Sequence, residues 1–229
     1  MKLTFYGHST VLVEIANTRL LFDPFISPNP NAQHIDLKSI ACNYIFLSHG
    51  HQDHVADALA LAQQNNAQLI SNFEVVSWFA NKYNYTNNHP MNHGGSWAFE
   101  FGTVRYVNAI HSSNMPDGSY GGNPGGFVVC TNEGNLYFAG DTALTMDMQL
   151  IPRYANPLQV AILPIGSNFT MDYRDACTCA QWTGCKTAFA VHFDTFPYIA
   201  VSHNEVKAHF EQAGIPLILP TKIGQTFEL

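Results

Sequence analysis

The segment Ser48-His49-Gly50-His51-Gln52-Asp53-His54 determines how the rest of this chain is interpreted. It follows directly on the apolar run Tyr44-Ile45-Phe46-Leu47, which is typical of a buried strand. A strand that ends in three imidazoles and a carboxylate presents several metal ligands from one rigid support. Neutral imidazole and carboxylate suit zinc and other first-row divalent ions. The segment therefore predicts a metal site; the alternative is a loop of solvated histidines with Asp53 as a helix N-cap.

The length and composition of the chain are those of a globular protein. Its 229 residues, 46% of them apolar, suffice for one large domain or two small ones. No apolar run is long enough to cross a bilayer, so no membrane association is expected. The first apolar stretch breaks at Gly7-His8, before the apolar core of a secretory signal could form. We therefore expect a cytoplasmic protein.

The five cysteines fit a reducing compartment, because their number is odd and their spacing shows no pairing typical of disulfides. Cys177, Cys179 and Cys185 fall in a segment with a helical pattern. We interpret them as small fillers of the core or surface and not as zinc ligands.

Charged residues make up only 12% of the chain, and the net charge is −7. Because no run of Lys or Arg could neutralise phosphates, nucleic acid is not an expected partner. The same shortage disfavours a tRNA-processing nuclease, and the missing signal peptide disfavours a secreted antibiotic-degrading enzyme. A small-molecule substrate is the expected partner, and the low surface charge is compatible with a homo-oligomer.

A similar order of elements occurs twice along the chain. In the first half a hairpin ends at Asp23, and a strand at 44–47 leads into the histidine cluster. A helix around Val55–Gln64 and a strand at Leu69–Ser71 follow. In the second half a hairpin ends at Asp141, and a strand, a helix and a strand follow at Val160–Leu163, Asp175–Gly184 and Ala188–Val191.

This repetition predicts the fold class. We expect an α/β (α+β) protein, a four-layer αββα sandwich of two mixed β-sheets with outer helices. Residues 1–229 would form a single domain with a pseudo-two-fold internal repeat, whose halves are about 1–115 and 116–229. Ligands at the strand ends of both halves would then meet at one edge of the sandwich.

The cluster and three later residues form an ordered series, His49-x-His51-x-Asp53-His54, His111, Asp141 and His192, that resembles the metallo-β-lactamase superfamily. Shorter motifs extend the resemblance over essentially the whole chain. They include Tyr6-Gly7-His8-Ser9, Phe22-Asp23-Pro24-Phe25, Ala139-Gly140-Asp141-Thr142, Asn168-Phe169-Thr170-Met171 and His192-Phe193-Asp194-Thr195-Phe196-Pro197. Within the superfamily, they resemble the cytoplasmic metal-dependent hydrolases related to the ascorbate-6-phosphate lactonases.

The resemblance implies a set of seven metal ligands. His49, His51 and His111 would bind one ion. Asp53, His54 and His192 would bind a second, with Asp141 bridging the two. The expected cofactors are two divalent metal ions per chain, with zinc as the first choice and manganese or iron as alternatives. Asp53 is also the candidate catalytic residue, because its free oxygen could orient the nucleophile or pass a proton to the leaving group.

Three further residues are candidates for support or substrate binding. His8 ends the first turn and could hold a ligand in place or contact the substrate; the alternative is an ordinary turn histidine. Asp23 mirrors Asp141, and we expect it to hold the histidine loop by hydrogen bonds. Asn168 is a candidate substrate contact; Ser167 stands before it where many relatives carry an acidic residue.

Two other features lie outside this ligand pattern. His93 sits where relatives tend to carry an apolar residue, and we interpret it as a loop substitution. The segment 112–125, which is rich in Gly and Pro, is either a mobile lid beside the site or an ordinary surface loop.

Together these features predict a binuclear metal-dependent hydrolase. A hydroxide shared by the two ions would attack a small cytoplasmic lactone, ester or phosphodiester. The alternative in the same superfamily is a mononuclear-iron oxygenase of the sulfur-dioxygenase type, which needs only two or three His and one Asp. Asp53, His54 and His192 favour two metals over that alternative. A binding protein with a relic site is disfavoured, because every ligand position is intact.

Overall fold

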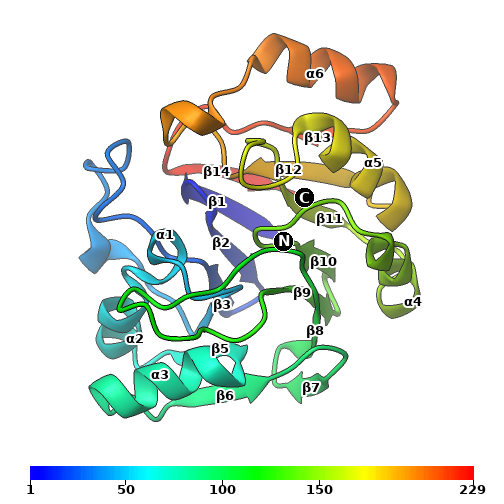
Figure 1. The fold of residues 1–229 in the computed structure, drawn as a ribbon. Helices are drawn as coiled ribbons and strands as arrows, with labels where there is room; N and C mark the ends of the chain where they lie inside the picture. Colours follow the sequence, from blue (N-terminus) through cyan, green and yellow to red (C-terminus); the bar gives the residue numbers. More distant parts are fainter.

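Two seven-stranded mixed β-sheets form the centre of the computed structural model, which describes residues 1–229 (Figure 1). The first sheet has the order Gln225–Glu228 (β14), Lys2–Gly7 (β1), Thr10–Ile15 (β2), Thr18–Phe22 (β3), Tyr44–Phe46 (β4), Gln68–Asn72 (β5) and Asn88–Met91 (β6). The second has the order Leu217–Ile218 (β13), Thr187–Val191 (β12), Val160–Pro164 (β11), Gly134–Phe138 (β10), Gly125–Thr131 (β9), Gly102–Asn108 (β8) and Ser96–Phe99 (β7).

Helices cover the outer face of each sheet (Figure 1). Beside the first sheet lie Gln52–Val55 (α1), Ala58–Asn65 (α2) and Phe73–Tyr83 (α3). Beside the second lie Ile151–Tyr154 (α4), Tyr173–Thr183 (α5) and His203–Gln212 (α6). The short 3-10 helices are Leu37–Ser39 (η1), Met146–Leu150 (η2) and Pro197–Ile199 (η3). The predicted sandwich of two mixed sheets with outer helices is confirmed. None of the helices is long and apolar enough to cross a membrane.

Successive side chains of each strand point to opposite faces of the sheet. Three apolar layers therefore form between the four layers of secondary structure. On β4, Phe46 packs between the sheets, while Ile45 packs under the helices of the first half. On β11, Ile162 faces the same central layer, and Ala161 packs under the helices of the second half. Both faces of these strands are buried, so their sequences are continuously apolar. The ring of Phe22 stacks on those of Phe46 and Phe138, at centroid distances of 4.8 and 4.7 Å, and thereby joins the two sheets.

Both sheets have an antiparallel part followed by a parallel part. Strands β1 to β3 are antiparallel and β3 to β6 parallel; β8 to β10 are antiparallel and β10 to β13 parallel. The chain enters the second sheet at β7, before the expected midpoint near residue 115, and β14 returns to the first sheet. The carboxyl ends of parallel strands lie on one edge of a sheet. The loops that follow β4, β10 and β12 therefore emerge where ligands from both halves can meet.

The predicted helix around Val55–Gln64 corresponds to α2, which begins three residues later than predicted because a break at residues 56–57 separates it from the single turn of α1. Asp57 lies between the two helices, and its buried carboxylate accepts hydrogen bonds from the backbone N–H groups of Ile26 (2.6 Å) and Ser27 (2.9 Å). These bonds fasten the loop after β3 to the break between the helices. Helical periodicity does not indicate such a contact, since its partners are 30 residues or more away.

Gly166, directly after β11 and Ile165, lets its own loop lie in close contact with the loop that carries His192. A Cβ at this position would collide with the carbonyl oxygen of His192 and lie 2.8 Å from Cβ of Ile199. We predict that Gly166→Ala lowers the free energy of unfolding by about 1–3 kcal/mol, since crowding of this kind must be relieved by backbone movement. Thermal unfolding followed by circular dichroism should show a Tm lower by about 2–4 °C for each kcal/mol. An unchanged Tm would show that the two loops separate freely.

Candidate metal centre

The seven predicted ligands converge on the edge where the strands of both sheets end. His49 and His51 lie between β4 and α1, and Asp53 and His54 belong to the single turn of α1. The other three, His111, Asp141 and His192, follow β8, β10 and β12. Local structure in each half of the chain thus directs side chains to the same place.

The first group consists of His49, His51 and His111, whose ligand atoms all lie within 4.8 Å of one another. Nε2 of His49 is 2.9 Å from Nδ1 of His51. His49 is fully buried, whereas His51 and His111 are partly exposed. The group therefore lies at the border between the core and solvent, where a substrate can approach.

The second group consists of Asp53, His54, His192 and also His8, again within 4.8 Å of one another. Asp53 retains 29% exposure of its side chain, while the three histidines are buried. Asp53 is therefore the member of this group that reaches the solvent side.

Asp141 lies between the two groups. Its Oδ2 is 3.0 Å from Nε2 of His192, 3.3 Å from Nε2 of His54 and 3.6 Å from Nε2 of His111. The first two neighbours belong to the second group and the third to the first group. This is the position expected of a carboxylate that serves two neighbouring cations.

Unpartnered buried atoms test whether these residues fit a metal. Nε2 of His54 and Oδ1 of Asp141 are buried and have no hydrogen-bond partner. A buried polar atom without a partner costs about 1–3 kcal/mol, so a folded site is expected to supply one. Imidazole and carboxylate atoms that face a common point are suitable ligands for a divalent first-row cation. The residues therefore fit the predicted divalent metal ions.

The protonation of these side chains also follows from this crowding. Burial disfavours the charged form of His54, but Asp141, Asp53 and Asp23 outweigh that effect and hold its pKa well above the ordinary value. Burial likewise opposes ionisation of Asp141, yet His192 and His54 hold its pKa well below the ordinary value. Protons therefore occupy positions that cations would take, and metal binding must release them.

Asp23 supports ligands on both sides of the site. Its Oδ1 accepts the backbone N–H of Ser48 at 2.7 Å, and its Oδ2 accepts the Ser48 hydroxyl at 2.6 Å. The same Oδ2 lies 2.8 Å from Nδ1 of His54, while Oγ of Ser48 is 2.9 Å from Nδ1 of His49. A hydrogen bond to the second ring nitrogen orients a histidine toward its metal. The structure thus places Asp23 where the sequence predicted support for the histidine loop.

His8 supports Asp53. Its Nε2 lies 3.0 Å from Oδ2 of Asp53, and its Nδ1 lies 3.0 Å from Oγ1 of Thr195. Burial, followed by the neighbouring His192, lowers the pKa of His8 to about 4. A neutral ring that donates from Nε2 to Asp53 accepts the Thr195 hydroxyl at Nδ1. The sequence gave no sign of Thr195, because its role depends on a contact between positions 187 residues apart.

Asn168 and the segment 112–125 differ in how firmly they are held. Asn168 is exposed and has a left-handed backbone conformation (φ 54°), and its side chain makes no hydrogen bond to any of the ligands. The segment is fastened: Oγ of Ser113 accepts from the N–H of Gly50 at 3.1 Å, and Nδ2 of Asn72 donates to the carbonyl of Gly121 at 2.8 Å. The segment therefore forms one wall beside the first group, and its mobility stays a prediction.

Residues 18–193 match the model of the Beta-lactamase superfamily domain. A UPF0173 metal-dependent hydrolase from Flavobacterium johnsoniae is 50% identical over 229 residues, covering all of both chains. One from Methylacidiphilum infernorum is 47% identical over 219 residues, 96% of each chain.

Solved structures show the same fold. Igni18, a metallo hydrolase from the archaeon Ignicoccus hospitalis, has a TM-score of 0.88 and 30% identity, with coverage of 100% of this chain and 98% of that one. An isothiocyanate hydrolase from Delia radicum gut bacteria has a TM-score of 0.78 at 18% identity, covering 100% and 99%, which supports the fold alone. Because the family model spans most of the chain and relatives near half identity span all or nearly all of it, this protein belongs to the metallo-β-lactamase superfamily, as one of its metal-dependent hydrolases.

Proposed function

We propose that the protein is a binuclear hydrolase that acts on a small, neutral ester or lactone with an apolar substituent. The two ligand groups on either side of Asp141 support the binuclear state. A mononuclear-iron oxygenase would use one group and leave the other as a buried cluster of imidazoles and carboxylates without a cation, which is costly. Zinc is the first choice for both sites because imidazole nitrogen predominates among the ligands.

The observation that carries the choice of substrate is the scarcity of positive charge on the loops that carry the ligands and on their neighbours. Six loops at the ligand edge contain neither Lys nor Arg: 23–36, 47–57, 109–124, 140–150, 165–172 and 192–202. The loop after β13 contains a single Lys, Lys222. Proteins commonly recognise phosphoryl groups through Arg or Lys. A neutral carbonyl substrate is therefore favoured over the phosphodiester, and the relation to the ascorbate-6-phosphate lactonases stays a prediction.

Apolar side chains on these same loops also favour such a substrate. Phe169 and Tyr198 are 52% and 74% exposed, and their rings pack edge to face at 6.3 Å between centroids. Ile110, directly before His111, is 52% exposed. Such exposed apolar groups beside a functional site are typical of ligand contacts. They would receive the apolar part of the substrate.

The residues of the chain have distinct tasks in this reaction. When bound, the cations would lower the pKa of a coordinated water and polarise the substrate oxygen that gains charge. Asp53 lies at the solvent side of the second group, where it can accept a proton and pass it to the leaving group. His8 and Thr195 hold that carboxylate in one orientation.

We predict that neutral substrates are preferred. With zinc-loaded protein, kcat/KM for phenyl acetate or dihydrocoumarin should exceed that for bis(4-nitrophenyl) phosphate by about tenfold or more, since no side-chain cation stabilises the anionic substrate. Phe169→Ala and Tyr198→Ala should raise KM for the apolar esters. Trp97→Ala, an exposed aromatic on β7, is the matched control and should change nothing. Preference for the phosphodiester would refute the proposed substrate class.

Asp53→Asn tests the proton role. The variant keeps the shape of the side chain but loses the negative charge, so activity should fall by about a hundredfold, in the range of general acid–base contributions. Metal content must be measured on the same sample, since part of the loss could come from weaker metal binding. A variant with full metal content and near-normal turnover would leave Asp53 as a ligand only.

A further inference from the structure

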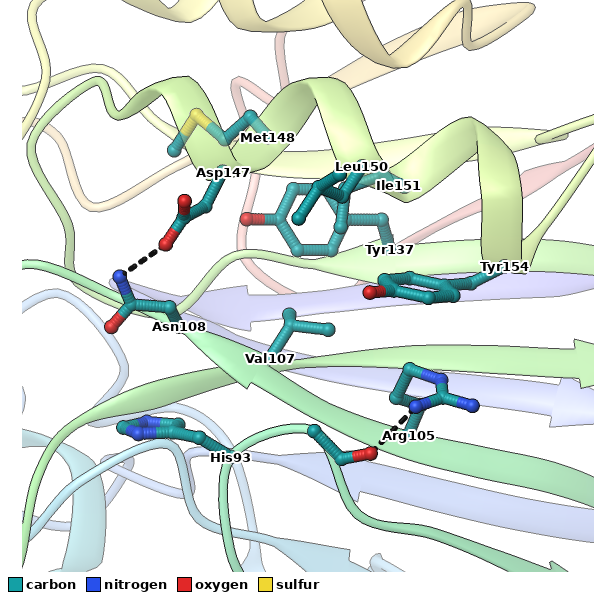
Figure 2. Close-up of a pocket in the computed structure, with 11 residues that line it drawn as sticks. His93, Arg105, Val107, Asn108, Tyr137, Asp147, Met148, Leu150, Ile151 and Tyr154 are labelled. Atoms are coloured by element: carbon teal, nitrogen blue, oxygen red, sulfur yellow. Dashed lines mark hydrogen bonds between the residues drawn. The ribbon is translucent and has the colours of Figure 1, made fainter.

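A cavity lies on the outer face of the second sheet, under η2 and α4 (Figure 2). Its volume is about 170 Å³. Val107 on β8 and Tyr137 on β10 line it from the sheet, and Met148, Ile151 and Tyr154 line it from η2 and α4. None of the seven metal ligands lines this cavity, so it is separate from the metal centre.

Tyr137 has an unsatisfied polar atom beside this cavity. The residue is fully buried, and its hydroxyl has no hydrogen-bond partner. Figure 2 shows this hydroxyl directed toward the side of the cavity where Asn108 and Asp147 lie. Phenylalanine would fill the same space without this cost, so the hydroxyl is expected to have a partner that is not part of the chain.

Arg105 supplies an unpaired positive charge at the opposite end of the cavity (Figure 2). Its guanidinium stacks on the ring of Tyr154, with 4.4 Å between its central carbon and the ring centroid. One nitrogen donates to the carbonyl of Gly94 at 2.6 Å, and no carboxylate lies within salt-bridge distance. A guanidinium has five N–H donors in a fork that matches a carboxylate. Most of these donors remain available to a ligand.

The two ends of the cavity therefore differ in charge. Asp147 accepts a hydrogen bond from Nδ2 of Asn108 at 2.7 Å and gives its end negative charge. An anionic group is favoured beside Arg105 and a neutral hydroxyl beside Tyr137, with apolar side chains between them. His93 completes the rim, fixed by stacking on Tyr106 and by donating from Nε2 to the carbonyl of Pro124 at 2.9 Å.

We propose that this cavity binds a small ring-containing carboxylic acid, with its carboxylate on Arg105 and a ring hydroxyl at the far end near Tyr137. An engineered cavity of roughly 150 Å³ in another protein accommodates benzene, so a single six-membered ring suits the size found here. His93, which the sequence suggested was a plain loop substitution, becomes part of the rim of this site. The inference does not depend on the proposed hydrolytic substrate.

Calorimetric titration of the metal-loaded protein with 4-hydroxybenzoate tests the carboxylate contact. Arg105→Gln should weaken binding by about tenfold or more, since a charge-assisted contact is lost. Arg153→Gln removes an exposed positive charge from α4, outside the cavity lining, and should leave the Kd unchanged. A carboxylate bound to the metal ions instead would be insensitive to Arg105→Gln, and that result would overturn the proposal.

Tyr137→Phe tests the other end independently. The wild type should bind 4-hydroxybenzoate more tightly than benzoate, and the variant should bind the two acids equally. Its Tm should not fall, since the substitution removes a polar atom without a partner in the chain. Equal binding of both acids by the wild type, or no saturable binding at millimolar concentration, would refute the site.

Discussion

The buried carboxylate of Asp23 is the interaction on which the metal centre depends. A fully buried carboxylate is costly unless its oxygens are satisfied, and here the N–H and hydroxyl of Ser48 and the ring of His54 satisfy them. These contacts fix the end of β3, the loop after β4 and the turn of α1 relative to one another. Through Ser48 they also orient His49. The first-half ligands of both metal groups are therefore preorganised by one side chain that is not itself among the seven ligands.

The second half completes the site from a different sheet. Asp141 and His192 follow parallel strands whose positions are set by the central aromatic layer, where Phe22 stacks on both Phe46 and Phe138. Packing between the sheets thus determines the distance between the two sets of ligands. The loops that carry the ligands remain free to vary in charge and polarity. Here they are uncharged apart from acidic groups and carry exposed aromatic rings, which is the basis of the proposed neutral substrate.

Much of this arrangement could be predicted from the sequence, because apolar alternation and ligand spacing are local signals. The paired strand–helix–strand units, the histidine cluster and the support from Asp23 follow from such signals. The full set of seven ligands is implied by the resemblance to the superfamily. The break between α1 and α2 could not, since it depends on Asp57 bonding a loop 30 residues away. Short edge strands such as β13 and β14 are defined by pairing and not by pattern. The same holds for the bond of His8 to Thr195, which requires the two halves already folded together.

The most direct test of this account is a titration of metal-free protein with Co²⁺, followed by its d–d absorption. The account predicts two equivalents bound per chain, because the ligands form two groups that share Asp141. His192→Ala should weaken one equivalent and Asp141→Ala should weaken both. Binding that saturates at one equivalent in the wild type would contradict the binuclear centre and favour the mononuclear alternative.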